Sequence, residues 1–256
     1  MNAVPITVLI TCFNEENNME ALLKSVQWAA EILIIDSFST DRTLEIAQQY
    51  PTKILQRTYQ GPADQKNWAI PQATYPWILI LDADERVTSE LAKEIRQILQ
   101  IKESQDGYWI KRKNYFMGQH IRHSGWGNDK VVRLIQRDKC QYDDKQVHEE
   151  IDTSTIKIGQ LNAYLIHNTF KDVDHYLAKI QRYARWSAQD YAHKTTRVTW
   201  FHLYGKPAFR FFKHFILQKG FLDGKVGFII SSIMAWGVFL RYVHLKQLLS
   251  KKEPSE

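Results

Sequence analysis

The stretch from Trp77 to Glu85 constrains the fold more than any other part of the chain. It reads Trp-Ile-Leu-Ile-Leu-Asp-Ala-Asp-Glu, so an apolar run leads directly into an acidic cluster. Such a run predicts a strand buried on both faces, as in a parallel sheet covered by helices. The acids then follow its carboxyl end, where open α/β sheets bind ligands. Asp82 and Asp84 suit Mg²⁺, which takes one or two carboxylates together with substrate phosphates. For the motif taken alone, an acidic loop after a core strand is the alternative.

Strands and helices alternate along the first hundred residues. Apolar runs predict strands at residues 6–11, 32–35, 54–55 and 77–81, and the spacing of apolar residues predicts helices between them and at 88–101. This alternation favours a parallel, doubly wound α/β sheet. Further strand-like segments occur at 108–111 and 130–136. Because no Gly-x-Gly-x-x-Gly is present, an ordinary dinucleotide-binding fold is disfavoured.

Acidic loops follow three of these strands, and all three are expected along one edge of the sheet. They are Asn14-Glu15-Glu16, Asp36 with Asp41, and Asp82-Ala83-Asp84. This layout suits a nucleoside diphosphate held through a divalent metal, with carboxylates for the ribose hydroxyls and the base. A hydrolase with paired carboxylates is the alternative, but it would not need the repetition. Asp41 also suits a helix N-cap, and the two glutamates suit the positive end of a helix.

The motifs in these loops resemble those of a known family. Thr7–Glu16, Asp36–Asp41 and Leu81–Asp84 are similar to the signatures of family-2 glycosyltransferases with the GT-A fold, over roughly residues 4 to 170. The chain resembles the bacterial lipopolysaccharide core β-1,4-glucosyltransferases more closely. That likeness extends through Gln60-Gly61, Gln65-Lys66-Asn67, Val147-His148-Glu149 and Gly220-Phe221-Leu222-Asp223-Gly224. Many relatives read Asp-Asp-Gly-Ser at the second loop, where this chain has Asp36-Ser37-Phe38-Ser39.

The resemblance implies a binding site for the nucleotide of a sugar donor. Asn14 and Glu16 belong to the first motif of that site. Asp36 would contact the uridine, and Asp82 would contact the ribose or the metal. Lys66 would lie near the diphosphate. The donor implied is a UDP-hexose, most simply UDP-glucose.

The resemblance also implies a divalent metal, Mg²⁺ or Mn²⁺. Asp84 would bind it directly, with Asp82 beside it. His167 matches the position of a C-terminal metal-binding histidine in many enzymes of this fold. It follows Leu165 and Ile166, so a hydrogen-bonded core histidine is the alternative.

Glu149 matches the general base of an inverting reaction. It would take a proton from an acceptor hydroxyl, whose oxygen attacks the anomeric carbon while the nucleoside diphosphate leaves onto the metal. Its neighbours His148 and Glu150 leave the assignment open by one residue, and His148 is also a candidate acceptor contact. Trp126, between two glycines, is either a stacking platform for the acceptor sugar or a packing residue.

The last third of the chain differs from the rest in charge. Residues 171–252 hold 15 Lys and Arg against four Asp and no Glu, whereas residues 1–170 hold 19 basic and 22 acidic residues. We therefore expect a catalytic domain at 1–170 and a basic, aromatic-rich helical region at 171–256. Its helices are expected at 174–192 and 207–218, followed by a 15-residue uncharged run at 226–240. That run is shorter than the ~20 residues of a spanning helix.

A basic helix beside an apolar segment suits the interface of an anionic membrane. The alternative is that these aromatic residues pack on the catalytic body. Nucleic acid is disfavoured because no recognition motif accompanies the basic residues. The two cysteines match no metal spacing, which favours free thiols, and no signal peptide is recognised, so a cytoplasmic protein peripheral to the inner face of the membrane is expected.

The function implied is an inverting, metal-dependent glycosyltransferase acting on the inner core of a lipid-linked lipopolysaccharide. One alternative keeps the fold but takes polyprenyl phosphate or another glycolipid as acceptor. Another is a non-catalytic nucleotide-sugar binding protein at the membrane. A sugar nucleotidyltransferase is disfavoured, since no Gly-rich loop follows the first strand.

Overall fold

The computed structural model describes residues 3–101, 105–143, 150–170 and 173–251. The chain divides into two compact units. The first, Met1–Lys113 with Asp129–His167, contains the main part of the sheet and is called the sheet unit here. The second, Asn114–Asn128 with Asn168–Glu256, is called the helical unit. It includes a segment, 114–128, that the charge boundary near residue 170 does not predict.

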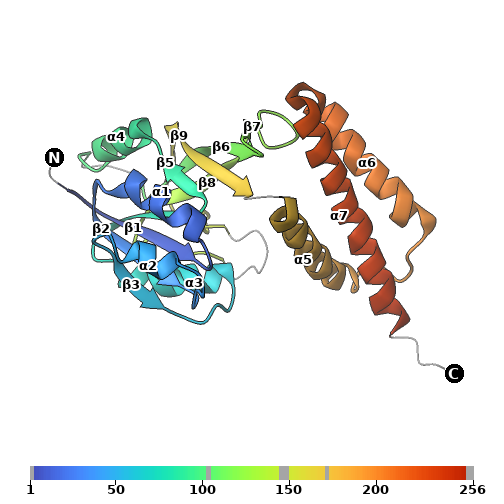
Figure 1. The fold of residues 1–256 in the computed structure, drawn as a ribbon, viewed down its shortest axis with the longest axis horizontal. Coiled ribbons are helices and arrows are strands. Elements are labelled where there is room, and N and C mark those ends of the chain that lie inside the picture. The colour runs from blue at the N-terminus through green and yellow to red at the C-terminus, as the bar shows by residue number, and fades with distance from the viewer. Residues whose placement is uncertain (1–2, 102–104, 144–149, 171–172, 252–256) are drawn as a thin grey trace. The chain divides into compact units, whose positions relative to one another are not determined.

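The sheet has nine strands in the order β3-β2-β1-β4-β8-β6-β9-β5, and β7 pairs with β6 (Figure 1). Its strands are β1 (Val4–Cys12), β2 (Ala29–Asp36), β3 (Lys53–Gln56), β4 (Trp77–Asp82), β5 (Glu85–Val87), β6 (Gly107–Phe116), β7 (Gln119–His120), β8 (Lys130–Gln136) and β9 (Ile158–Phe170). Strands β3, β2, β1 and β4 are parallel, as the alternating pattern predicts. From β4 onward the pairs β4–β8, β6–β8 and β5–β9 are antiparallel, so the sheet is mixed.

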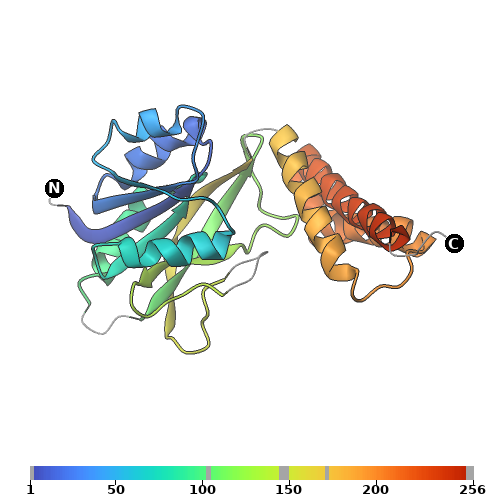
Figure 2. The same ribbon diagram turned by 90° about the horizontal axis from the view of Figure 1, so that it is seen from below.

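Helices cover both faces of the parallel part of this sheet (Figure 2). They are α1 (Glu16–Val26), α2 (Thr43–Ala47), α3 (Pro62–Ala69) and α4 (Ser89–Ile98), with a 3₁₀ turn η1 (Ile70–Gln72) after α3. The apolar sides of α1, α2 and α4 share one core with the sheet, and α3 contributes to the other. Central strands such as β4 are buried on both faces because each face has its own core, which explains their uninterrupted apolar sequence.

The helical unit is built on α7 (Gly224–Ser250), which packs against α5 (Val173–Tyr191) and α6 (Lys206–Phe212). Two π-helical segments, η2 (Phe201–Gly205) and η3 (Lys213–Leu217), flank α6, and a 3₁₀ turn η4 (Gly220–Asp223) leads into α7. Close contact between α5 and α7 needs a glycine at 237, because a Cβ there would lie 2.9 Å from Cγ2 of Ile180.

Helix α7 is longer than the uncharged run 226–240 indicates. Within the part of the chain that the structure describes, it is the one helix whose length and apolar composition would allow it to cross a membrane. Residues that include Ile230, Val238, Tyr242 and Leu245 are nevertheless buried inside the helical unit. Of its most apolar stretch, 28% is buried, so packing within that unit accounts for part of its apolar character.

The tail motif at 220–224 anchors a loop of the same unit. The carboxylate of Asp223 accepts hydrogen bonds from the backbone N–H groups of Arg122 and His123 and from the Ser124 hydroxyl, at 3.0 to 3.1 Å. Its backbone carbonyl accepts one from the Gln119 side chain at 3.0 Å. The motif thus has a structural role that its sequence did not reveal.

Candidate functional site

The three predicted acidic loops lie at neighbouring strand ends. Cys12 of β1 is in register with Asp36 of β2, and Thr11 of β1 with Asp82 of β4. Because these strands are parallel, their carboxyl ends share one edge of the sheet. The structure therefore brings the three loops together as the sequence predicts.

The first two loops bind each other through hydrogen bonds. The Asn14 side-chain oxygen accepts from the N–H of Thr40 at 2.8 Å. The Glu16 side chain accepts from the N–H of Arg42 at 3.1 Å, and its own N–H donates to Asp41 at 3.1 Å. Asp41 also accepts from the N–H of Thr43 at the start of α2, but the N-cap position of this helix is Arg42, one residue after the predicted one. These hydrogen bonds fix the first two loops to each other at the edge of the sheet.

Asp36 is fully buried at the end of β2. Its carboxylate accepts hydrogen bonds from the Ser39 N–H and hydroxyl and from the Gln56 side chain. The Cys12 thiol also faces it at 3.7 Å. Burial, with the nearby Asp36 charge, raises the pKa of the Cys12 thiol, so this cysteine is an inert packing group.

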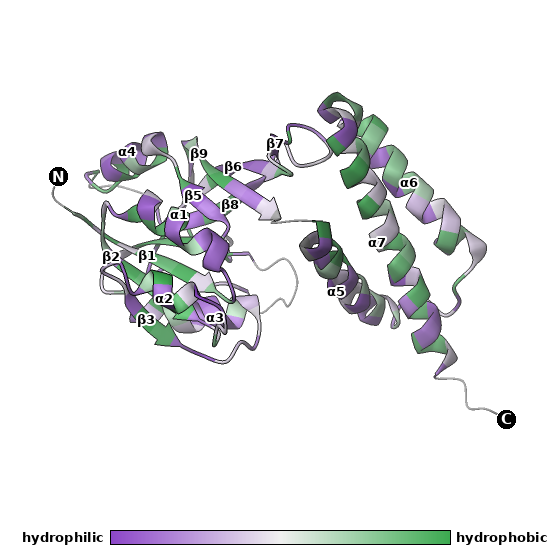
Figure 3. Ribbon diagram, viewed as in Figure 1, coloured by the Kyte–Doolittle hydropathy of each residue, from purple (hydrophilic) through white to green (hydrophobic). Residues whose placement is uncertain are grey.

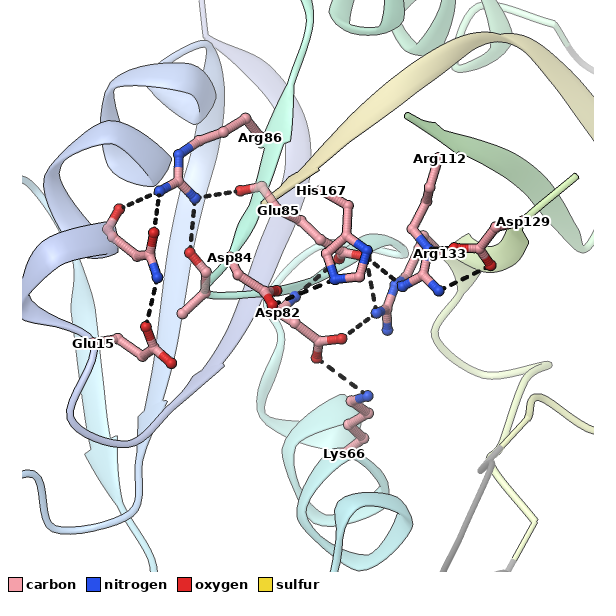
Figure 4. A network of polar contacts seen from close by, with 12 residues as sticks. Glu15, Lys66, Asp82, Asp84, Glu85, Arg86, Arg112, Asp129, Arg133 and His167 are labelled. Atoms are coloured by element: carbon pink, nitrogen blue, oxygen red, sulfur yellow. Dashed lines mark hydrogen bonds and ion pairs between the residues drawn. The ribbon is translucent and has the colours of Figure 1, made fainter. Parts of the chain in front are cut away.

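Asp82 lies between two cations (Figure 4). Its carboxylate pairs with Nζ of Lys66 at 3.3 Å and with the guanidinium of Arg133. Burial opposes ionisation of Asp82, but Arg133, Lys66 and Arg112 outweigh it and hold the pKa of the carboxyl far below its usual value. Both cations are almost fully buried, whereas about a third of the Asp82 side chain, 36%, is exposed.

Buried Glu85 and Arg133 form a network with the partly buried Arg112 and Asp129, and the sequence motifs assign no role to these four residues. One Glu85 oxygen accepts from Arg112 and from Arg133, both at 3.1 Å, and the other accepts from the backbone N–H of Asp82 at 3.1 Å. Asp129 takes two hydrogen bonds from Arg112. Burial disfavours the charged form of Arg133, yet Asp82 and Glu85 hold the pKa of its guanidinium well above the usual value. The sequence signal for this network was Arg133, which lies inside the apolar run of β8. A buried charge needs a partner of opposite charge, so an acidic residue was to be expected nearby.

Asp84 and His167 face each other beside this network. Nε2 of His167 lies 3.3 Å from Oδ2 of Asp84. Antiparallel pairing of β5 and β9 places His167 opposite Glu85, which brings a residue distant in sequence to the acidic turn. The structure therefore joins two of the three predicted metal ligands, Asp84 and His167, directly, whereas the third, Asp82, pairs with Lys66 and Arg133.

Arg86 fixes the acidic turn to α1. Its guanidinium donates to the carbonyls of Ala83 and Glu85 and to the backbone and side-chain oxygens of Asn18. Asn18 in turn donates to Glu15 at 2.7 Å. Glu15 thus connects to the turn that carries Asp84 through two side chains (Figure 4).

The donor set at this turn fits a hard divalent cation. Asp84 supplies carboxylate oxygens and His167 an imidazole nitrogen, and the two face one another rather than packing apart. No group of three or more His, Cys, Asp or Glu side chains arranged to hold a metal occurs among the described residues. A cation here would take its remaining ligands from water and from substrate phosphates, which is the usual arrangement for Mg²⁺.

The predicted base and acceptor residues have different outcomes. Glu149 and His148 lie outside the described residues. Trp126 belongs to the helical unit, where it is partly buried against an apolar cluster with Phe116 and Ile121. Its ring meets that of Phe116 edge-on with centroids 6.2 Å apart. This contact agrees with the packing alternative for Trp126.

Comparison with known proteins identifies relatives over most of the chain. Residues 7–156 match the family model described as glycosyl transferase family 2. The lipopolysaccharide core biosynthesis glycosyltransferase LpsC of Rhizobium meliloti (strain 1021) is 26% identical over 252 residues, and the alignment covers 93% of each chain. The match to LpsC therefore includes the helical unit.

Two solved structures share the fold. The mannosyltransferase PcManGT from Pyrobaculum calidifontis, in complex with GDP-Man and Mn²⁺, gives a TM-score of 0.51 at 14% identity, over 99% of this chain and 89% of that one. S. aureus TarS 1–349, in complex with UDP-GlcNAc, gives 0.50 at 16% identity, over 100% and 93%. At such identities the likeness is one of fold.

Proposed function

The chain belongs to glycosyl transferase family 2, and from this premise we propose that it is an inverting, metal-dependent enzyme that transfers glucose from UDP-glucose to the inner core of lipopolysaccharide. The family match and the shared fold confirm the resemblance to GT-A glycosyltransferases that the sequence motifs suggest. The donor, the metal, the acceptor and the residue roles are the proposal.

One observation carries the proposed chemistry. A carboxylate and an imidazole, those of Asp84 and His167, face each other next to a carboxylate bound by two cations. Asp84 and His167 would hold the divalent metal, which when bound neutralises charge on the phosphates of the donor. Lys66 and Arg133 would add fixed positive charge for the same diphosphate. Asp36 and the loop at Asn14 and Glu16 would bind the nucleoside.

In the proposed reaction, Glu149 takes the proton from an acceptor hydroxyl. The oxygen of that hydroxyl forms a bond to the anomeric carbon, and the bond from this carbon to the nucleoside diphosphate breaks. Charge that develops on the departing diphosphate is stabilised by the prearranged cations Lys66 and Arg133, which need no reorganisation at the moment of reaction. The role of Glu149 rests on its match to the family motif.

The acceptor proposal rests on the relation to LpsC, whose name places it in lipopolysaccharide core biosynthesis. A lipid-linked acceptor would place the enzyme at the inner face of the cytoplasmic membrane. The basic helical unit and its long apolar helix α7 support a peripheral location there. An anionic membrane surface and a lipid-linked oligosaccharide are then its partners, and nucleic acid is not.

Release of nucleoside diphosphate tests this function. The purified full chain is incubated with Mg²⁺ or Mn²⁺ and a panel of UDP- and GDP-sugars, with and without lipopolysaccharide core acceptor. We expect metal-dependent release from UDP-glucose that the core acceptor stimulates. Release from another donor would replace the sugar nucleotide, and stimulation by polyprenyl phosphate instead would replace the acceptor. Binding without any release would favour the non-catalytic alternative.

Asp84→Ala tests the metal assignment, with Asp138→Asn as the control. Asp138 is an exposed carboxylate paired with Arg137 on the sheet unit. We expect Asp84→Ala to abolish transfer while its circular dichroism spectrum is unchanged, and Asp138→Asn to leave transfer intact. Normal turnover of folded Asp84→Ala would show that the metal assignment is wrong.

A further inference from the structure

Large apolar side chains are exposed along the helical segment 200–217 of the helical unit. They are Trp200, Phe201, Tyr204, Phe209, Phe212, Ile216 and Leu217, called the aromatic stripe here, and between 43% and 73% of each is exposed. Single exposed hydrophobic residues are normal on a protein surface, but a continuous row of them marks an interaction site.

The helix geometry of this segment bears on how its exposed side chains align. Trp200, Tyr204, Phe209, Phe212 and Ile216 follow one another at intervals of three to five residues, about four on average. In a regular α-helix of 3.6 residues per turn, such a repeat drifts around the axis by roughly 40° at each step. The π-helical segments Phe201–Gly205 and Lys213–Leu217 have more residues per turn and offset this drift.

The apolar surface continues beyond the stripe into η4 and the start of α7. Phe221, Leu222 and Phe228 are each exposed by 48% or more. The ring of Phe215 connects them, with its centroid 6.4 Å from that of Phe221 and 5.7 Å from that of Phe228. Hydropathy colouring shows α7 as largely hydrophobic and α6 as mixed (Figure 3).

The exposed charge of residues 191–251, which carry this surface, has a single sign. Between residues 191 and 251, Asp223 is the only acidic residue, and it is buried with its carboxylate bound to the loop at 122–124. Exposed cations accompany the apolar surface along its length: Lys194, Arg197, Lys213, Lys219 and Lys225. A surface of exposed aromatic rings with only basic charge complements an anionic lipid headgroup layer.

Two other basic residues of the segment point inward instead. Nζ of Lys206 donates to the Tyr242 hydroxyl at 2.8 Å, and Arg210 lies 3.3 Å from Nε2 of His214. The side of the segment that faces α7 is therefore mixed, since Leu203 also packs there against the cluster of Val238, Tyr242 and Leu245. The exposed side chains of the stripe, 43% or more of each open to solvent, are left over from this packing.

We propose that the aromatic stripe lies in the headgroup layer of an anionic phospholipid membrane and docks the helical unit there. The inference rests on the proposed function, because docking would bring the enzyme to a lipid-linked acceptor. It assigns the contact, which the sequence suggests for the basic helix and the apolar run together, to the exposed residues of the segment 200–217. A contact at the membrane surface suits the helical unit better than a membrane-spanning α7. Helix α5 packs along α7 and carries exposed Arg182 and Arg185, so insertion of α7 would bring these charges into the hydrocarbon layer.

Vesicle cosedimentation of the full chain tests the stripe. We expect binding to phosphatidylcholine vesicles that contain phosphatidylglycerol and weaker binding to phosphatidylcholine alone. The double variant Phe209→Gln/Phe212→Gln should weaken binding to the anionic vesicles by about tenfold or more. Ile216→Gln should weaken it severalfold, whereas the matched control Ile101→Gln, an isoleucine of similar exposure on the sheet unit, should have no effect. Lys213→Gln should cost about fivefold on anionic vesicles only.

Three results would overturn the inference. These are no binding to anionic vesicles, unchanged binding of the Phe209/Phe212 variant, and a lipid-free dimer that this variant abolishes, which would assign the stripe to a second copy of the chain. Turnover with a deacylated core acceptor is measured on the same samples. Stripe variants should retain it, since these side chains belong to the helical surface. If neither the unsubstituted chain nor any variant turns over the donor, the proposed function is wrong. The vesicle-binding results still test the membrane contact of the stripe in that case.

Discussion

Glu85→Gln is expected to destabilise the sheet unit strongly although it changes one atom. Glu85 is fully buried and accepts hydrogen bonds from Arg112, from Arg133 and from the N–H of Asp82. A glutamine can keep one oxygen as acceptor, but its NH₂ group then faces N–H donors. The two arginines also lose the negative charge that they share.

The remaining partners limit the loss. Arg112 keeps its two hydrogen bonds to Asp129, and Arg133 keeps its ion pair with Asp82. Removing one partner of a buried ion pair costs about 3–5 kcal/mol. We expect the lower end of that range, about 3 kcal/mol, because neither arginine is left without a carboxylate. This corresponds to roughly a hundredfold shift in the unfolding equilibrium.

Hydrogen exchange measured by mass spectrometry on peptides from β4 and β8 reports the stability of the affected strands. Asp138→Asn is the control, because it also neutralises a carboxylate that binds an arginine through two hydrogen bonds, but on an exposed surface. Exposed pairs contribute little to stability. If the two variants accelerate exchange equally, the network around Glu85 is not what stabilises this region, and our reasoning from burial is wrong.

Two further predictions concern other groups. His214 is buried, donates through Nδ1 to the Ser124 carbonyl at 2.9 Å, and its pKa is lowered by burial and by Arg210 and Lys213. As the pH drops through the ordinary pKa of 6.5, the unfolded state therefore binds more protons than the folded state. The contribution of His214 to the free energy of unfolding should be complete above this pH and should decrease below it. Denaturant titrations between pH 5 and 8 should show this fall, and His214→Gln should remove it. Phe38 is half-exposed with φ of +62°, so Phe38→Asn should raise the free energy of unfolding by about 0.5–1 kcal/mol; a decrease in the same assay would show that the ring makes stabilising contacts.

The strand and helix pattern of the sheet unit could be predicted because local sequence determines it. Apolar runs such as residues 77–81 become strands covered on both faces, and the acidic loops follow them at one edge. The antiparallel part was harder to predict, because pairing of β8 with β4 and of β9 with β5 depends on contacts between distant segments. That pairing is what brings His167 to Asp84.

The helical unit shows a different limit of sequence reasoning. The charge change near residue 170 marks its beginning, but the segment 114–128 joins it through hydrogen bonds to Asp223 that no local pattern reveals. The spacing of Phe209, Phe212 and Ile216 predicts one apolar side of a helix. Whether that side is buried or exposed depends on the packing of α5, α6 and α7, which the sequence does not specify.

The buried cations of the site explain why its carboxylates have unequal environments. Lys66 and Arg133 are almost fully buried, and a buried cation without a counter-charge is costly. Glu85 is fully buried and pairs with Arg133, whereas Asp82 is partly exposed at the sheet edge to which we assign the nucleotide. In the proposed function, a diphosphate that arrives there brings negative charge of its own to these cations. The two cations can therefore stay charged and in place before the nucleotide binds and after it leaves. This arrangement depends on the buried acid Glu85, which the sequence alone did not identify.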